Sequence, residues 1–374
     1  MIFGMTKELV IGVAVLGGMV LGSFLYASNN RNPVSVAFVG NSFQYVNDLP
    51  RFLQALSQDR IEYQDSCLHG SLRFQTFLQY GNGMFEKWNT DAAYDFDDGV
   101  YDFGSCTVSQ LLVGYDDRLS ALDNGDDDYY DNDDGNDDDY YIDDEKNPCL
   151  QDNDYLLYTL NNKVPVKYDY VVLSDQSMQP AIFEGREESI DVLKNSYAPL
   201  LLENGATPVF IMTWAYWRED IDMAEMGLVD VPTFASRLYH GYTQYAKTLA
   251  EILPAAQKPR IAPVNLAFLL IHEENYSFWK NNLFGEDNFH PSPSGTYLAG
   301  CVIHATIFGQ LPIHPPTLDM TIDSLWGKAR AMQFSGEDLD LPTEDEALYL
   351  RWIAGRVVFD GDFPESLSLE EETQ

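Results

Sequence analysis

The chain has 374 residues, of which 45% are hydrophobic, so it can form one large domain or two smaller ones. Its formal net charge is -37, because 59 Asp and Glu outnumber 22 Lys and Arg. The few cations form no basic cluster and cannot neutralise a phosphate backbone. The composition therefore excludes nucleic acid as a partner.

An uncharged, mostly apolar run stands near the N-terminus, from Leu9 to Ala27, with Lys7 before it. Such a run is typical of a secretory signal or a membrane anchor. Leu25 or Tyr26 stands where signal cleavage prefers a small residue, which favours an uncleaved anchor. Four glycines in the run and the adjacent Glu8 argue against an anchor. We expect residues 1–28 to route the chain to the secretory pathway, membrane-anchored or secreted; a buried N-terminal helix is the third alternative.

The cysteine count is even, which suits two disulfides in an oxidising compartment, with three possible pairings. The cysteines are Cys67, Cys106, Cys149 and Cys301. Their spacing matches no metal site, and Cys301 lies in an apolar helical stretch that also suits a free buried thiol. The sequon Asn275-Tyr276-Ser277 would be glycosylated only if the domain is lumenal or extracellular.

Three short apolar runs predict buried strands, at residues 34–39, 168–173 and 207–213. The first ends in Gly40-Asn41-Ser42, and a helical pattern opens at Asp48. The other two are each followed by a loop and a helix-like segment. Strands that alternate with helices predict an α/β fold with a parallel sheet covered on both faces.

An acidic segment at residues 116–145 interrupts this pattern with 14 Asp, one Glu and one Arg. Its self-repulsion and small aliphatic content predict a disordered insertion. Tyr130 and Tyr141 occupy positions where an EF-hand needs ligands, so we expect the segment to solubilise the protein rather than form a calcium site.

The alternation of strands and helices ends near residue 310, where a Pro-rich stretch, 311–316, breaks the last core helix. In the remaining extension, 311–374, Thr343 and Glu346 form a capping box ahead of a predicted helix at about 343–358. The last residues are acidic. The pattern thus predicts one domain, 33–310, with an inserted segment and a C-terminal extension.

Ser42 is the candidate nucleophile because it follows a buried strand in a Gly-containing turn that leads into a helix. Asp287 and His290 supply the rest of the chemistry. They lie three residues apart, so the carboxylate can accept from imidazole Nδ1 and leave Nε2 as the base. An apolar helix, 296–308, follows them. Each motif alone also occurs in ordinary turns and loops.

Together, Gly40-Asn41-Ser42-Phe43 and Asp287-x-x-His290-Pro291 resemble the first and last blocks of the SGNH (GDSL-like) hydrolases. The resemblance covers roughly residues 34–310. It implies a three-layer α/β/α sandwich of flavodoxin-like type around a parallel sheet. The closest likeness is to a branch with a Gln-containing third block, a Thr-Trp strand end, here Thr213-Trp214, and a His-Pro-Ser closing block.

The resemblance also implies oxyanion donors after the second and third strands. Gly70 matches the Gly block by position, and its N–H would act beside that of Ser42. The third block departs from the family pattern, because it has no Asn, and Gln176 is the expected replacement. Trp214 could form a substrate wall at the sheet edge, although such residues are as often packing.

The sequence therefore predicts an ester hydrolase that uses Ser42, His290 and Asp287, with no metal or organic cofactor. Its expected substrate is a small ester or an O-acyl group on a glycan. The alternative is a catalytically weak scaffold, tethered to a membrane, that binds cations or partners through the acidic insertion. The sequence leaves the oligomeric state open.

Overall fold

The computed structural model describes residues 33–78 except 59, then 94–95, 100–101, 107–114, 166–313 except 219, 220 and 222, then 321–329 and 340–368. The expected N-terminal segment, 1–28, and the acidic insertion, 116–145, lie outside these ranges and stay predictions. Within the ranges, no helix is both long enough and apolar enough to cross a membrane.

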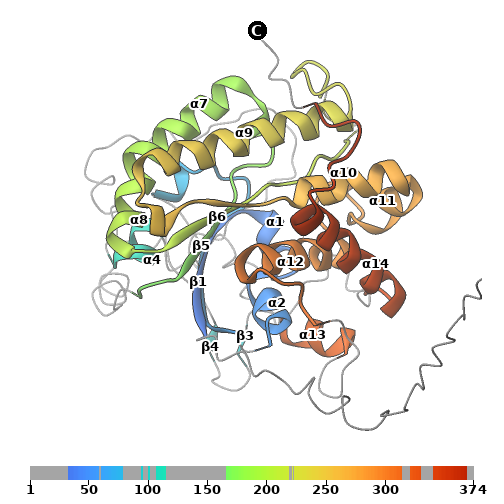
Figure 1. Cartoon of the computed structure of the whole chain (residues 1–374), viewed down its shortest axis with the longest axis horizontal. Coiled ribbons are helices and arrows are strands. Elements are labelled where there is room, and N and C mark those ends of the chain that lie inside the picture. The colour runs from blue at the N-terminus through green and yellow to red at the C-terminus, as the bar shows by residue number, and fades with distance from the viewer. Residues whose placement is uncertain are drawn as a thin grey trace, which may run out of the picture. The chain divides into compact units, whose positions relative to one another are not determined.

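Five parallel strands form the central sheet in the order β2-β1-β5-β6-β7 (Figure 1). Their bounds are β1 (Val34–Gly40), β2 (Ile61–Leu68), β5 (Tyr170–Leu173), β6 (Thr207–Ile211) and β7 (Arg260–Ala262). Three of them, β1, β5 and β6, confirm the predicted strands. The order reverses between β1 and β5, and ligands of such sheets bind where this reversal lies, beyond the carboxyl ends of the strands.

Helices cover both faces of the sheet (Figure 1). One layer holds α4 (Val108–Val113), α7 (Phe183–Val192), α8 (Ala198–Asn204) and α9 (Val231–Ile252). The other holds α2 (Leu49–Leu56), α12 (Pro293–Phe308), α13 (Ile322–Ala329) and α14 (Glu344–Gly355). This arrangement confirms the predicted three-layer α/β/α sandwich.

Shorter elements connect these layers. They are α1 (Ser42–Tyr45), α10 (Val264–Glu274), α11 (Tyr276–Asn282), the 3-10 turns η1 (Thr76–Leu78), η2 (Gln179–Ala181) and η4 (Ala255–Gln257), the π-helical turns η3 (Leu193–Tyr197) and η5 (Arg356–Asp360), and an antiparallel pair, β3 (Tyr94–Asp95) with β4 (Val100–Tyr101).

The core lies between the sheet and the helix layers. In β1 the side chains of Val36, Ala37, Phe38 and Val39 are all fully buried, as a strand covered on both faces requires. Helix α12 is buried nearly all round. Helix α14 packs against α12 and begins at a capping box of Thr343 and Glu346. The C-terminal extension thus packs on the same core as the sheet.

Two of the four cysteines lie in described parts of the chain. The Cys67 thiol is buried in β2 and lies 4.0 Å from the Phe77 carbonyl oxygen, to which it donates. Cys301 is the free buried thiol that its helical setting predicts, and burial raises its pKa to about 12. Cys106 and Cys149 lie outside the described ranges.

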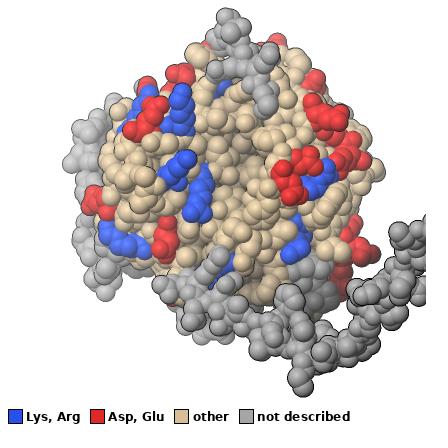
Figure 2. Space-filling view, viewed as in Figure 1, with Lys and Arg blue, Asp and Glu red and all other residues tan. Residues whose placement is uncertain are grey.

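Charge is mixed on the surface of the described domain. Figure 2 shows Lys and Arg side chains next to Asp and Glu side chains on one face, with wide areas that carry neither. The longest acidic run of the sequence, 116–145, belongs to the part that is not described. That run alone accounts for about -14 of the net charge of -37.

Helix α9 crosses η2 so closely that only glycine fits at the crossing. A Cβ on Gly241 would overlap the carbonyl oxygen of Pro180. We expect Gly241→Ala to lower the free energy of unfolding by about 1–3 kcal/mol. On an exposed helix surface the same change stabilises a protein by about 0.5–1 kcal/mol. The sign of the change in stability therefore distinguishes a close crossing from an exposed position.

Urea unfolding followed by circular dichroism measures this change. Thr243→Ala, at an exposed position on the same helix, is the control and should stay within about 0.5 kcal/mol of the wild type. A Gly241→Ala protein as stable as the control would contradict the close crossing.

Candidate active site

The turn after β1 presents Ser42 at the first position of α1. Asn41 caps this turn, because its side-chain oxygen accepts from the Phe43 N–H at 3.2 Å. Its Nδ2 donates to the Asp175 carbonyl oxygen at 2.8 Å. Since Asp175 follows β5, the Asn41 side chain joins the ends of the two strands between which the strand order reverses.

Gly40 is required here by packing, not by its backbone angles. A Cβ at this position would overlap the side chains of Gln44 and Ser174. Gln44 reaches back across the glycine, and its Nε2 donates to the Val39 carbonyl oxygen at 3.0 Å and to Ser174 Oγ at 2.8 Å. Gln44 thereby holds the nucleophile turn against β1 and the end of β5.

Asp287 and His290 form the expected pair. His290 Nδ1 lies 2.5 Å from Asp287 Oδ2, and Asp287 Oδ1 accepts from the backbone N–H groups of Phe289 and His290 at 3.0 and 2.9 Å. Burial acts to raise the pKa of Asp287, but the hydrogen bond and charge of His290, with those two N–H groups, lower it to about 2. Asp287 is thus ionised at neutral pH and favours the imidazole tautomer with its proton on Nδ1.

Several contacts hold the His290 loop beside the Ser42 turn. Asn47, just after α1, donates through Nδ2 to the Pro291 carbonyl oxygen at 2.8 Å and to Thr296 Oγ1 at 2.9 Å. The ring of Phe43 meets the ring of His290 edge to face, with centroids 6.0 Å apart. The structure therefore brings the Ser42 turn and the Asp287–His290 loop together from opposite ends of the sequence.

Trp214 supports this arrangement from the core. Its ring is 1% exposed and stacks between Phe43, at 4.4 Å, and Phe268, at 4.8 Å. Its Nε1 donates to the Phe289 carbonyl oxygen at 3.3 Å. A ring so enclosed offers substrate no open face, which corrects the expectation of a Trp214 wall, whereas Trp217 is 40% exposed.

Gly70 lies close to the nucleophile helix. The preceding residue, His69, donates its backbone N–H to the Gly40 carbonyl oxygen at 3.0 Å. A Cβ on Gly70 would stand 2.8 Å from the hydroxyl of Tyr45, a residue of α1. The position after β2 therefore leaves little room for a side chain and adjoins the turn of Ser42.

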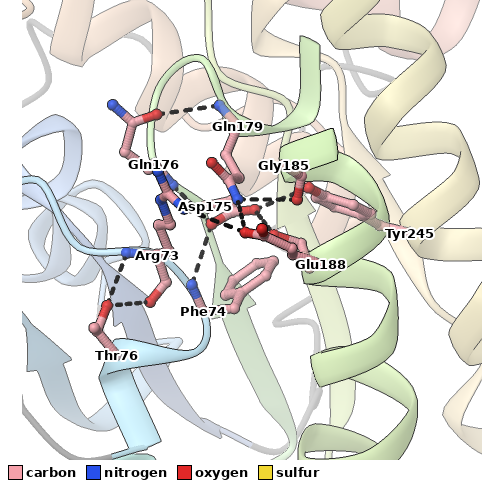
Figure 3. Close-up of polar contacts among 10 residues, drawn as sticks. Arg73, Phe74, Thr76, Asp175, Gln176, Gln179, Gly185, Glu188 and Tyr245 are labelled. Atoms are coloured by element: carbon pink, nitrogen blue, oxygen red, sulfur yellow. Dashed lines mark hydrogen bonds and ion pairs between the residues drawn. The ribbon is translucent and has the colours of Figure 1, made fainter. Parts of the chain in front are cut away.

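The side-chain oxygen of Gln176 has a structural role. Its Oε1 accepts from the backbone N–H groups of Met178 and Gln179 at 2.9 and 3.1 Å and so begins η2 (Figure 3). The other half, Nε2, is the donor left for a substrate. The side chain is partly exposed, at the end of β5.

Asp175, like Asn47 and Gln44, is not among the site residues predicted from the sequence. Its carboxylate is fully buried, and four donors reach it from separate segments (Figure 3). Oδ1 accepts from the N–H groups of Phe74 and Gln176 at 3.2 and 2.9 Å. Oδ2 accepts from Ser189 Oγ at 2.6 Å and from Tyr245 Oη at 2.9 Å.

Burial raises the pKa of Asp175 to about 6, although all four hydrogen bonds oppose this rise. The carboxylate connects the loop after Gly70, the loop of Gln176, and helices α7 and α9. The sequence indicates it only as an acidic residue directly after a buried strand. Burying a carboxylate at such a position is unfavourable unless hydrogen-bond donors surround it.

No group of three or more His, Cys, Asp and Glu suited to a metal ion occurs in the ranges that the structure describes. No family model matches the sequence, and no curated protein matches it significantly.

Two solved structures are similar to this chain. One is a candidate SGNH hydrolase from Slackia heliotrinireducens, with 18% identity, 74% of this chain and 100% of that chain covered, and a TM-score of 0.42. The other is a DUF4886 family protein from Bacteroides uniformis, with 14% identity, 89% and 98% covered, and a TM-score of 0.48. Likenesses at this level concern the fold, which the strand order of the sheet establishes independently.

The Asp175 hydrogen bonds generate a prediction with a matched pair of variants. Asp175→Ala orphans four buried donors and should lower the free energy of unfolding by more than about 3 kcal/mol. Asp175→Asn keeps an acceptor for the two backbone N–H groups, and its amide can donate to the hydroxyls of Ser189 and Tyr245. Urea unfolding should show Asp175→Asn close to the wild type at pH 4.

The pH dependence of the same pair is a further part of this test. Folding raises the pKa of Asp175 above its ordinary value of 3.8, so its ionisation lowers the stability of the wild type as pH rises through about 6. Relative to Asp175→Asn, the wild type should lose roughly 2.5 kcal/mol between pH 4 and pH 7. A difference that is constant with pH would contradict the raised pKa.

Proposed function

We propose that the protein is a carboxylic ester hydrolase of the SGNH type that works through an acyl-enzyme on Ser42. The observation that carries this proposal is the Asp287–His290 pair, joined at 2.5 Å and fastened beside the Ser42 turn by Asn47. A nucleophile, a base and a group that orients the base are the three parts that such a reaction needs.

In the first half-reaction, Ser42 Oγ attacks the acyl carbonyl carbon while His290 Nε2 takes the hydroxyl proton. The tetrahedral intermediate then expels the alcohol, which receives that proton from His290. Asp287 stays ionised and stabilises the imidazolium that forms between these steps.

In the second half-reaction, water attacks the acyl-enzyme as His290 takes a proton from it. The intermediate collapses, and Ser42 leaves with the proton returned by His290. The products are the carboxylic acid and the free enzyme. This chemistry needs no metal or organic cofactor.

The oxyanion of both intermediates would accept from the N–H groups of Ser42 and Gly70 and from Gln176 Nε2. Support for Gly70 comes from its place against Tyr45 of α1. Support for Gln176 comes from the hydrogen bonds of its carboxamide. Oε1 accepts from the N–H groups of Met178 and Gln179, which fixes the side chain and leaves Nε2 for the oxyanion. These hydrogen bonds limit the conformational freedom of the Gln side chain, which is longer than that of Asn.

We further propose that the substrate is a small ester or an O-acyl group on a glycan, met in the secretory pathway if residues 1–28 act as signal or anchor. The alternative, a weak scaffold that binds through the acidic insertion, depends on residues outside the described ranges. The completeness of the Asp287–His290 pair favours catalysis over that alternative.

Replacing the nucleophile gives the direct test of this function. Ser42→Ala should reduce turnover of p-nitrophenyl acetate by at least about a thousandfold and abolish labelling by a fluorophosphonate probe. Ser324→Ala, on exposed α13, is the control and should behave as the wild type. Equal labelling of Ser42→Ala and wild type would contradict the assignment of the nucleophile.

The oxyanion role of Gln176 has its own variant. Gln176→Glu keeps the acceptor that begins η2 but removes the Nε2 donor and places a negative charge near the oxyanion. We expect kcat to fall by about a hundredfold or more, with KM changed much less, because the donor acts mainly in the transition state. An unchanged kcat in a folded Gln176→Glu protein would remove Gln176 from the oxyanion site.

A further inference from the structure

A cavity of about 710 Å³ opens directly beside Asp287 and Asn288. Its other walls come from the loop after β6, from the start of α9 and from α10 and α11. It therefore lies at the carboxyl edge of the sheet, as the Ser42 turn does. Its size falls in the range of small-molecule sites.

Aromatic rings line this cavity, and two of them are unusually exposed. Trp217 is 40% exposed and Tyr276 is 54% exposed, although both are large and apolar. Tyr276 stacks on Trp279, with ring centroids 5.6 Å apart and planes 24° apart. Flat, accessible ring faces of this kind bind the C–H faces of sugar rings as well as other rings.

The charged residues of the lining balance one another. They are the cations Arg218 and Lys280 and the carboxylates Asp230 and Asp287. Arg218 lies over the ring of Phe289, with its guanidinium carbon 5.4 Å from the centroid. In a chain with a net charge of -37 the cavity is thus locally neutral but rich in polar groups, which suits a neutral, polar ligand.

We propose that this cavity binds the alcohol part of the ester as a neutral, polyhydroxylated ring of the pyranose type, which stacks on Trp217 and Tyr276. The inference rests on the proposed hydrolase function for its link to catalysis. A fatty acyl chain would leave the charged and polar lining groups unsatisfied. An anionic ring would gain little from a lining with equal numbers of cations and carboxylates.

The cavity adjoins the loop that carries His290, and this position links the proposed ligand to the reaction. Asp287 and Asn288 form part of its wall, and His290 follows two residues later. A sugar held there presents an ester on its near edge to Ser42. After acyl transfer to Ser42, the released hydroxyl stays with the sugar and takes its proton from His290.

The test compares two esters on the full-length protein. The ratio of kcat/KM for a methyl O-acetyl-glucopyranoside to that for p-nitrophenyl acetate reports the use of the cavity. We expect Trp217→Ala and Tyr276→Ala each to lower this ratio about five- to tenfold, through loss of stacking. Tyr276→Phe, which keeps the ring, should retain most of the wild-type ratio. Trp352→Ala, which removes another exposed tryptophan outside the cavity, should not change the ratio.

A binding experiment separates this inference from the proposed function. The Ser42→Ala protein is titrated with an unacetylated methyl glucopyranoside and with methyl glucuronide, and tryptophan fluorescence reports binding. Weaker binding of the neutral glycoside by Trp217→Ala, and a preference for it over the glucuronide, supports the inference even if no ester is hydrolysed. Two results would overturn the inference. One is a specificity ratio that Trp217→Ala and Tyr276→Ala leave unchanged while turnover of p-nitrophenyl acetate still depends on Ser42, and the other is equal binding of the neutral glycoside with and without Trp217→Ala. Either result would leave the hydrolase proposal standing.

Discussion

The buried carboxylate of Asp175 is the constraint on which the rest of the site depends. An ionisable group with no exposure is tolerated only because four donors surround it, and these donors belong to separate segments of the chain. Satisfying one carboxylate therefore fixes the loop after Gly70, the loop of Gln176 and two helices of one layer at once. Asn41 adds the nucleophile turn to this group through the Asp175 carbonyl oxygen.

The Asp287–His290 pair is held by a second set of contacts. Asn47 and Trp214 hold the backbone on both sides of His290, while Asp287 holds its ring. The nucleophile turn thus lies between two independent supports, one centred on Asp175 and one on Asn47. Preorganisation of this kind is what lets donors and base act without rearrangement during the reaction.

Much of this architecture was predictable from the sequence, since β1, β5 and β6 are continuous apolar runs. The same was not true of β2, whose first half is polar and partly exposed, or of β7, which has three residues and so shows no pattern. The pairing of Ser42 with Asp287 and His290 followed from motif order, but the roles of Asp175, Asn47 and Gln44 did not. Their partners lie far away in sequence, up to 249 positions for Asn47, and only the folded chain brings them together. Trp214 was misjudged because a ring after a strand can face either the crevice or the core.

Mass spectrometry of the inhibited protein shows whether Ser42 is the nucleophile. After reaction with a fluorophosphonate, digestion should yield the peptide that contains Ser42 with the phosphonyl mass on that serine and on no other residue. An adduct on a different residue would contradict the role proposed for Ser42. So would an unmodified Ser42 in folded protein that hydrolyses p-nitrophenyl acetate.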